Sequence, residues 1–344
     1  MNVGIVGSTG YGGVELHRLL SNHPFVGDCI LYSSTLNGVS YAEQYPHLTD
    51  LSTESVRGIQ VDEMKELDVV FLAVPAGISK EMTPKLLGGK ARIIDLSGDL
   101  RLKDPKEYED WYKGEAADTS VLSEAVYGLA ECNQEAIKEA SLIANPGCFP
   151  TAALLALAPL IQQKLVQPGS LIIDAKTGLS GAGRKPSLSS HFSETQENLR
   201  IYKVHEHQHT PEIEQQLKLW NPEAAPVTFT THLIPMTRGI MTTIYGELLT
   251  DQTTEELHEL YRSFYSGSPF VRIRPIGQYP CTKEVFGTNF CDISIKVDPR
   301  TGKVTIVSVI DNLIKGAAGQ AVQNMNLMFG LEETSGLHYY PIYP

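Results

Sequence analysis

Short apolar runs alternate with stretches of helical spacing along the first 150 residues of the chain. Residues 13–22 repeat apolar side chains with the period of a helix, whereas the neighbouring apolar runs have the length of buried strands. The expected strands are Val3–Val6, Asp28–Tyr32, Val69–Ala73, Ala91–Leu96 and Leu142–Ala144. Strands separated by helical segments predict a parallel sheet with right-handed crossovers, and therefore an α/β domain.

From about residue 170 the pattern changes, because the apolar runs are mostly longer and alternate more with polar residues. Strands are expected here at Ser170–Ala175, Val227–Ile234, Ile240–Leu248, Asp292–Val297 and Lys303–Val309. The last two are joined by Asp298–Gly302, DPRTG, which is typical of a hairpin turn. The pattern predicts a mixed or antiparallel sheet in a second domain. Residues 312–329 then return to helical spacing, with small residues suited to close packing against the first domain.

Length and composition agree with two globular domains, since a chain of 344 residues exceeds the ~250–300 at which single cores stop growing. The net charge of −12 argues against a nucleic-acid or membrane-surface partner. The first strand begins at Val3, which leaves no room for a signal peptide, and no apolar run reaches the ~18 residues that span a membrane. Five scattered cysteines without a CxxC pair are typical of a reducing compartment, so we expect a cytoplasmic protein.

A glycine-rich loop, GIVGSTGYGG, follows the start of the first strand and opens the first helix. Its glycines are spaced as G-x-x-G-x-x-G, which differs from the usual dinucleotide pattern but allows the same close approach of backbone amides to a pyrophosphate. A plain tight turn is the alternative interpretation. The candidate cofactor residues are Gly7, Ser8, Thr9, Gly10, Tyr11, Gly12 and Gly13.

The end of the second strand favours NADP over NAD. An NAD site usually carries a carboxylate there, but this chain has YSSTLNG, which presents Ser33 and Ser34. Hydroxyl groups can donate to a 2′-phosphate, and no carboxylate would repel it. No arginine is evident in this stretch to clamp the phosphate.

One cysteine, Cys148, lies in a turn of sequence NPGCFPTA. Pro150 suits the first position of a helix, so Cys148 is expected just outside the N-terminus of that helix. The positive end of the helix dipole stabilises a thiolate, which indicates a nucleophile. A buried structural cysteine is the alternative.

A nucleophilic thiol needs a base, and VHEHQHTPEIEQQL places His205, His207 and His209 at alternate positions. On a strand, all three would face one side. We expect a helix capped by Thr210, which would keep His209 neutral as a base, with Glu212 near enough to orient a histidine. Three histidines could also bind zinc, but no further ligand clearly completes the shell, so no metal is expected.

Anion-binding candidates complete the set. Arg101, Arg184 and Arg238 lie in loop-like stretches, and Ser180, Gly181, Ala182 and Gly183 form a second glycine turn with exposed amides. Solvated arginines and a simple loop are the alternatives. We also count Pro75 among the cofactor-binding candidates and Asn145 among the substrate-binding candidates.

Together the motifs resemble the N-acetyl-gamma-glutamyl-phosphate reductases, and more broadly the aspartate-semialdehyde dehydrogenases. The resemblance runs from Asn2 to about Phe329. The motifs are the glycine loop, DLSGDLRL, VYGLAE, NPGCFPTA, TGLSGAGRKP, HQHTPEIEQ, HLIPMTRGI and DNLIKGAAGQAVQNMN.

The resemblance implies an NADP-binding Rossmann domain, residues 1–147 with 312–344. It also implies a catalytic and dimerisation domain of the glyceraldehyde-3-phosphate dehydrogenase type, residues 148–311. By the same analogy Cys148 is the nucleophile, and His209 is the acid/base residue with His207 and Glu212 nearby. Asn312 lies near the nicotinamide, and the assembly is a homodimer or homotetramer. The implied reaction is NADPH-dependent reduction of an acyl phosphate in arginine biosynthesis.

Three alternatives remain open. Another acyl-phosphate reductase, of the aspartyl or acetyl-aminoadipyl type, differs in its substrate by as little as one methylene, which binding distinguishes by only ~1–3 kcal/mol. A non-catalytic NADP sensor could keep the fold without the chemistry. A zinc hydrolase would use the three histidines.

Overall fold

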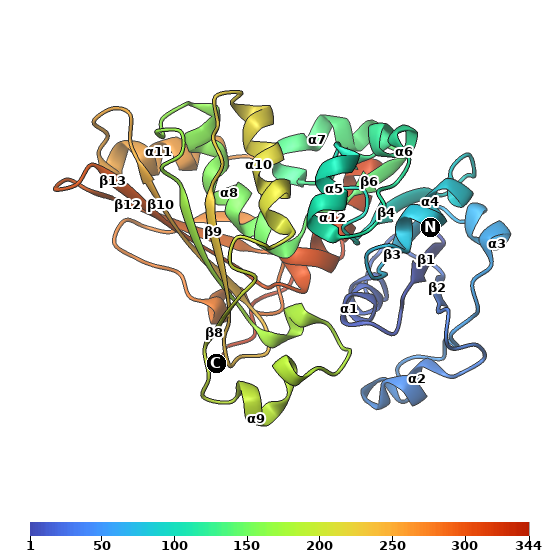
Figure 1. Cartoon of the computed structure of the whole chain (residues 1–344). Coiled ribbons are helices and arrows are strands. Elements are labelled where there is room, and N and C mark those ends of the chain that lie inside the picture. The colour runs from blue at the N-terminus through green and yellow to red at the C-terminus, as the bar shows by residue number, and fades with distance from the viewer. Residues whose placement is uncertain (344) are drawn as a thin grey trace. The chain divides into compact units, whose positions relative to one another are not determined.

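A computed structural model describes residues 1–343, which form two compact units (Figure 1). The first unit comprises Met1–Pro146 and Ala317–Leu337, and the second comprises Gly147–Gly316 and the residues from His338 on. Residues 147, 312–316 and 338–343 therefore group with the second unit, whereas the sequence indicated the first domain for them. Among the described residues, no helix is long and apolar enough to cross a membrane.

The first unit contains a six-stranded sheet in the order β2-β1-β3-β4-β6-β5. All of its pairings are parallel, and β1 and β3 are buried on both faces. The strands are β1 (Val3–Val6), β2 (Cys29–Tyr32), β3 (Val69–Leu72), β4 (Arg92–Asp95), β5 (Val126–Tyr127) and β6 (Leu142–Ala144). The predicted α/β domain is confirmed, while the two-residue β5 was too short to be predicted.

The first unit contains the following helical segments, all but the last of which connect strands of its sheet. They are α1 (Tyr11–Leu20), α2 (Tyr41–Gln44), η1 (Pro46–Leu48), α3 (Val61–Lys65), α4 (Ser79–Leu86), α5 (Pro105–Tyr112), α6 (Thr119–Glu124), α7 (Ala130–Glu139) and α12 (Gly319–Met328). Helix α1 begins two residues earlier than predicted, because the extended backbone of Gly10 serves as its N-cap. The first helical residue therefore lies inside the glycine loop.

Helix α12 is fixed to the first unit by buried amides. Gln320 and Asn324 both donate to the carbonyl oxygen of Gly128, at 2.9 and 2.8 Å, and Asn326 contacts the ring of His23 at 2.9 Å. All three amide side chains are fully buried, so each hydrogen bond offsets the cost of desolvating a polar group. These contacts explain three polar residues of the QAVQNMN motif, and the fourth, Gln323, donates to the carboxylates of Glu131 and Glu333.

The single helix expected over residues 312–329 is instead two elements. A π-helical segment, η5 (Ile314–Ala318), precedes α12. Asp311 starts it, because its carboxylate accepts from the N–H groups of Leu313 and Ile314 and its carbonyl accepts from Gly316. This capping by one aspartate widens the first turn, which helical periodicity alone does not reveal.

The second unit contains a seven-stranded mixed sheet in the order β11-β12-β13-β10-β7-β9-β8. Its strands are β7 (Ile172–Thr177), β8 (Arg200–Tyr202), β9 (Thr228–Leu233), β10 (Ile240–Glu247), β11 (Val271–Ile273), β12 (Cys291–Asp298) and β13 (Lys303–Ile310). The turn at Asp298 closes the predicted hairpin, with the N–H of Gly302 donating to its carbonyl at 2.9 Å. The predicted mixed sheet is confirmed.

Helices and 3₁₀ turns complete the second unit: α8 (Cys148–Gln162), α9 (Phe192–Thr195), α10 (His209–Trp220), α11 (Thr254–Phe264), η2 (Leu179–Ala182), η3 (Leu188–Ser190) and η4 (Thr282–Val285). Helix α8 packs against the sheet, α10 and α11 and is buried along most of its length. Pro159 has no N–H to donate to the carbonyl of Leu155, one turn back. The hydroxyl of Tyr265 donates to that carbonyl at 2.5 Å, so α8 continues past the proline.

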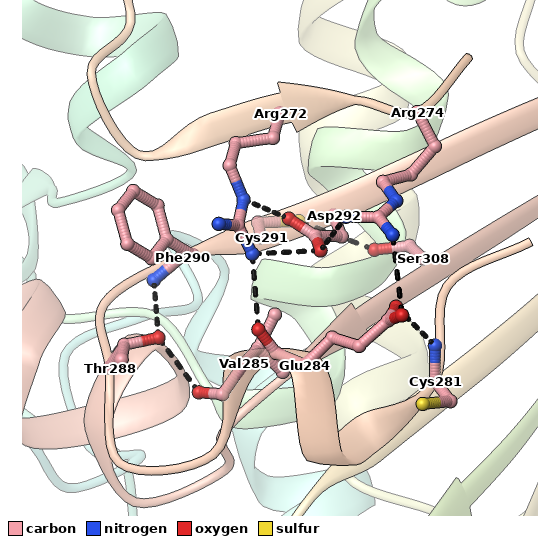
Figure 2. A network of polar contacts seen from close by, with 10 residues as sticks. All are labelled: Arg272, Arg274, Cys281, Glu284, Val285, Thr288, Phe290, Cys291, Asp292 and Ser308. Carbon is pink, nitrogen blue, oxygen red and sulfur yellow. Dashed lines mark hydrogen bonds and ion pairs between the residues drawn. The ribbon is translucent and has the colours of Figure 1, made fainter. Parts of the chain in front are cut away.

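An ion-pair network stabilises one end of this sheet (Figure 2). The buried carboxylate of Asp292 accepts from Arg272 at 2.5 and 2.9 Å and from Arg274 at 3.4 Å. The carboxylate of Glu284, on η4, accepts from Arg274 at 3.3 Å and from the N–H of Cys281 at 3.0 Å. The network therefore fixes η4 against β11 and β12.

Candidate active site

Cys148 is the first residue of α8, with Gly147 as the N-cap. The sequence analysis placed the cysteine just outside the helix and Pro150 at its first position. The helix starts two residues earlier, because the N–H of Thr151 donates to the carbonyl of Gly147. Cys148 is half-buried and lies against Gly316. An added Cβ at Gly316 would come within 2.7 Å of the Cβ of Cys148. Cys148 therefore lies within the first turn, where the helix dipole favours a thiolate.

The histidine segment is a turn and not a strand. β8 ends at Tyr202, and the chain then reverses with Lys203 and His205 at positive φ. Local bonds explain the reversal: the N–H of Glu206 donates to Lys203, and that of Thr210 to His207. His205 is exposed, whereas His207 and His209 are buried. The three rings therefore do not share one face.

The start of α10 also differs from the prediction. The helix begins at His209 with Gln208 as its N-cap, so Thr210 is its second residue and not the cap. Within residues 1–343, no group of three or more histidine, cysteine, aspartate or glutamate side chains is arranged to hold a metal ion.

His207 and His209 pack together beside the cysteine turn. Their ring centroids are 4.7 Å apart, and the ring of Phe149 lies 5.4 Å from His207 and 6.0 Å from His209. Burial, followed by the charge of Cys148, raises the pKa of Tyr202 well above its usual value. Tyr202 also packs on His207 at 5.7 Å. Aromatic packing thus joins both histidines to Phe149, the residue that follows Cys148.

The protonation state of His207 follows from its contacts. Burial lowers the pKa of His207 to about 3, and the charge of Lys203 acts in the same direction. Its Nδ1 accepts from the N–H of His209 at 3.1 Å, so the proton of the neutral ring is on Nε2. A ring that stays neutral across the physiological range is poorly suited to donate protons during turnover.

His207 should make the protein less stable in acid. The unfolded chain takes up a proton near pH 6.5, whereas the folded chain does so only near pH 3, so stability falls as the pH drops through this window. The free energy of unfolding should therefore decrease by about 2 kcal/mol more between pH 7 and 5 in the wild type than in His207→Asn. Denaturant titrations at both pH values measure this difference. Equal pH dependence of the free energy of unfolding in the two proteins would contradict the lowered pKa of His207.

Glu212 contacts the cysteine turn. This residue is fully buried on α10, and its carboxylate accepts from the N–H of Gly147 at 2.8 Å. The bond joins the first turn of α10, which begins at His209, to the N-cap of α8. Glu212 therefore fixes the backbone next to the thiol, a role that the sequence analysis did not assign.

Asn312 connects two further loops of the second unit. Its side-chain oxygen accepts from the N–H of Gly239 at 2.7 Å, and its amide donates to the hydroxyl of Ser180 at 3.0 Å. Backbone bonds from Leu179 to Met236 and from Ser180 to Thr237 hold the two loops side by side. The sequence candidates Ser180, Gly181, Ala182, Gly183, Asn312 and Arg238 thus belong to one cluster.

Within this cluster, Arg238 is half-buried. Its guanidinium lies 3.7 Å from the carboxylate of Asp311 and 5.9 Å from the ring centroid of Phe286. An added Cβ at Gly239 would come within 2.9 Å of Thr282 on η4, so the loop that carries Arg238 packs closely against η4. Residues 181–186, including Arg184, are exposed.

The glycine loop of the first unit is packed so closely that side chains at two of its positions would clash with the backbone. Gly7 has φ of 81°, and an added Cβ there would lie 2.2 Å from the carbonyl oxygen of Ala73. An added Cβ at Gly13 would lie 2.4 Å from the carbonyl of Gly7. The N-cap of α1, Gly10, has no side chain to cover the first N–H groups of the helix. The loop therefore fits the phosphates of a dinucleotide.

Ser33 and Ser34 line a shallow pocket at the end of β2, together with residues of the 35–37 and 58–59 segments. The hydroxyl of the buried Ser33 accepts from the N–H groups of Thr35 and Leu36, at 3.2 and 3.3 Å. Ser34 is exposed. Pro75 lies in an exposed turn after β3, and the carbonyl of Pro75 accepts from the N–H of Ile78.

Arg101 and Asn145 are buried in the first unit. Arg101 donates to the carbonyl of Asn145 at 2.8 Å and to that of Leu96 at 2.9 Å. The side chain of Asn145 donates to Ala317 and accepts from Asn324 at 3.0 Å. These contacts hold both side chains within the first unit.

Two tyrosines that support the glycine loop, Tyr41 and Tyr45, were not identified from the sequence. Each is more than 30 residues from the loop that it contacts, and no local pattern marks such a contact.

Comparison with known proteins identifies the family. Residues 2–140 match the semialdehyde dehydrogenase NAD-binding domain, and residues 148–312 match the semialdehyde dehydrogenase dimerisation domain. The first match identifies a domain that binds a nicotinamide cofactor.

Close relatives carry one name. The chain is 61% identical over 345 residues to N-acetyl-gamma-glutamyl-phosphate reductase of Bacillus subtilis strain 168, covering all of both chains. It is 60% identical over 338 residues to the protein of the same name from Bacillus amyloliquefaciens, covering 98% of each.

The fold is shared more widely. The crystal structure of aspartate semialdehyde dehydrogenase II from Vibrio cholerae is 18% identical and superposes with a TM-score of 0.73, covering 96% of this chain and 98% of that one. The resemblance inferred from the motifs is confirmed. The chain therefore belongs to the semialdehyde dehydrogenase family and, within it, to the N-acetyl-gamma-glutamyl-phosphate reductases, which are oxidoreductases.

Proposed function

We propose that this chain reduces N-acetyl-gamma-glutamyl phosphate to N-acetylglutamate semialdehyde and phosphate, with NADPH as the reductant, as a cytoplasmic enzyme of arginine biosynthesis. One observation carries the proposal: Cys148 opens a buried helix whose N-cap is held by Glu212, beside two packed histidines. That arrangement suits a covalent acyl intermediate. The names of the relatives at 60–61% identity indicate which acyl phosphate is used.

Cys148 is the proposed nucleophile. Its thiolate attacks the acyl carbon, and the bond to the phosphate oxygen breaks with its electron pair, which leaves a thioester and inorganic phosphate. The helix dipole of α8 stabilises the thiolate before the attack. Glu212 keeps the N-terminal turn in place, because its carboxylate accepts from the N–H of Gly147.

His209 is the proposed acid/base residue. The nicotinamide cofactor, when bound, supplies a hydride to the thioester carbon. His209 protonates the resulting oxyanion and then accepts that proton as the carbon–sulfur bond breaks, which releases the aldehyde and restores the thiolate. His207 is less suited to this step, since burial lowers its pKa to about 3.

Binding of the substrate and cofactor is assigned to the remaining candidates. Arg184 and Arg238 would bind the phosphate or carboxylate of the substrate, since guanidinium groups pair well with both. Asn312 and residues 180–183 would lie near the nicotinamide. Arg101 and Asn145 are also proposed as substrate-binding residues, and hydrogen bonds within the first unit hold their buried side chains in place.

NADP is the proposed form of the cofactor, because the pocket at the end of β2 presents Ser33 and Ser34 and no carboxylate among its lining residues. Ser34→Asp should raise the Kd for NADP about tenfold or more, since a carboxylate would repel the 2′-phosphate. The Kd for NAD should change little. Fluorescence titration measures both constants, with Ser123→Asp on the exposed side of α6 as the control. An equal rise in the Kd for NADP and the Kd for NAD would contradict the proposed preference for NADP.

A homodimer or homotetramer is also proposed. Residues 188–204 expose five large apolar side chains on or beside β8, the edge strand of the second sheet: Leu188, Phe192, Leu199, Ile201 and Val204. They lie within the region that matches a dimerisation domain. Burial of this patch by a second copy would remove apolar surface from water.

Disruption of that patch should shift the protein toward monomer. Phe192→Ser should weaken the assembly at micromolar concentration, as measured by light scattering on the purified chain. Leu51→Ser, which changes an equally exposed apolar residue of the first unit, is the control. A wild-type chain that is monomeric would contradict the assembly, and an unaffected Phe192→Ser assembly would exclude this patch.

The function is tested by following the absorbance of reduced nicotinamide with N-acetylglutamate semialdehyde, phosphate and either NADP or NAD. We expect rapid reduction of NADP that depends on both phosphate and the acetylated semialdehyde. Faster reaction with aspartate semialdehyde or with the acetyl-aminoadipyl homologue would contradict the proposed substrate.

A further inference from the structure

Two tyrosine hydroxyls bind consecutive carbonyl groups of the glycine loop. Tyr41 donates to the carbonyl of Ser8 at 2.7 Å, and Tyr45 donates to that of Thr9 at 3.0 Å. The ring of Tyr41 is fully buried, and that of Tyr45 is 9% exposed. Both tyrosines lie in the segment of residues 33–57, which starts at the end of β2 and returns to that strand.

This segment is held firmly. The N–H of Tyr41 donates to the carbonyl of Glu54 at 2.9 Å, and Ser40 pairs with Ser55 in a β-bridge. The Tyr41 ring packs edge-on against His17 of α1 at 4.9 Å and against Tyr45 at 5.3 Å. The tyrosines therefore contact both the loop and the helix that the loop opens, so the two hydroxyls are preorganised.

The two bonds determine the orientation of two peptide planes. In a trans peptide, the carbonyl of one residue and the N–H of the next point in opposite directions. The bond from Tyr41 to Ser8 therefore directs the N–H of Thr9 away from the tyrosine. The bond from Tyr45 to Thr9 sets the next plane, whose N–H, from Gly10, donates to Gly7 at 3.1 Å and closes the turn.

The electrostatic consequence concerns an anion bound at the loop. A carbonyl oxygen that faced a pyrophosphate would repel it, whereas N–H groups and the start of α1 attract it. Rotation of either peptide plane would break its hydrogen bond from a phenol hydroxyl. The two hydroxyls therefore keep two carbonyls turned toward the tyrosines, so that these oxygens would not face an anion bound elsewhere on the loop.

We infer that Tyr41 and Tyr45 are positioning residues for the pyrophosphate of the dinucleotide, acting through the backbone of the glycine loop. The inference rests on the proposed function, because it takes the loop to be the site of NADP. It also separates two effects on the cofactor. The tyrosines affect the binding of the pyrophosphate, and the pocket at Ser33 and Ser34 affects the binding of the 2′-phosphate.

The test compares two ligands in Tyr41→Phe, Tyr45→Phe and the double variant. Phenylalanine keeps the ring packing and removes only the hydroxyl. Calorimetry should show that the Kd for NADP rises about fivefold for each lost hydroxyl, as expected for one hydrogen bond. The Kd for adenosine 2′-monophosphate, which has no pyrophosphate, should stay within about twofold. Tyr340→Phe, on a side chain 87% exposed, is the matched control.

The outcomes separate the inference from the function on which it rests. If the wild type does not bind NADP, the proposed cofactor is wrong. If the wild type binds NADP and the double variant binds it equally well, the positioning role is wrong. Equal weakening of both ligands, together with a lower melting temperature, would show a merely structural role. Tyr45→Phe, at the rim of the packed rings, keeps the test valid if removal of the buried Tyr41 hydroxyl prevents folding.

Discussion

Replacement of Cys148 by serine is expected to lower kcat by about 10³-fold or more. A serine hydroxyl remains protonated where the helix dipole favours a thiolate, and an oxygen ester accepts hydride less readily than a thioester. The packing of α8 should be retained, because serine is nearly isosteric with cysteine. Steady-state turnover of the semialdehyde, phosphate and NADP measures the loss.

The control for this variant is Cys281→Ser. Cys281 is exposed, its backbone N–H donates to Glu284 in the network of Figure 2, and its side chain caps η4, a position that serine also suits. Its replacement should leave kcat unchanged. A Cys148→Ser enzyme that retained a tenth or more of the wild-type kcat, with an unaltered melting temperature, would be incompatible with covalent catalysis at this sulfur.

Replacement of His209 by asparagine should lower kcat by about 10²–10⁴-fold, the usual contribution of a general acid/base. His207→Asn should cost less than about tenfold, because an asparagine oxygen can still accept the N–H of residue 209. The two substitutions are chemically identical and two residues apart, so each is a control for the other.

The pH dependence of kcat distinguishes catalysis from support. If His209 transfers the proton, the His209→Asn variant should lose the ionisation that controls kcat in the wild type, whereas His207→Asn should keep it. A reversed order of the two losses would assign the proton transfer to His207 and contradict the inference that burial keeps this ring neutral during turnover.

The sequence was sufficient to predict the elements that depend on apolar periodicity. The strand Val3–Val6 and the hairpin at Asp298 lie where the pattern placed them. Those features follow from local burial and turn chemistry, which are encoded within a few residues. The Cys148 turn was identified for the same reason, with an error of two residues in the start of its helix.

Other parts of the site depend on contacts between distant segments. The alternation of His205, His207 and His209 resembled a strand, but hydrogen bonds within residues 203–210 favour a turn. Glu212 lies close to the histidines in sequence, but its carboxylate also accepts from the N–H of Gly147, 65 residues away. Apolar periodicity contains no information about such a partner.

The covalent intermediate is tested most directly by measuring the mass of the Cys148 peptide. The enzyme is mixed with N-acetyl-gamma-glutamyl phosphate without reduced cofactor, quenched in acid and digested. We expect the peptide that contains Cys148 to gain the mass of one N-acetylglutamyl group, and to lose it when NADPH is added before the quench. Steady turnover with no adduct on this peptide, or with an adduct on another residue, would contradict the account.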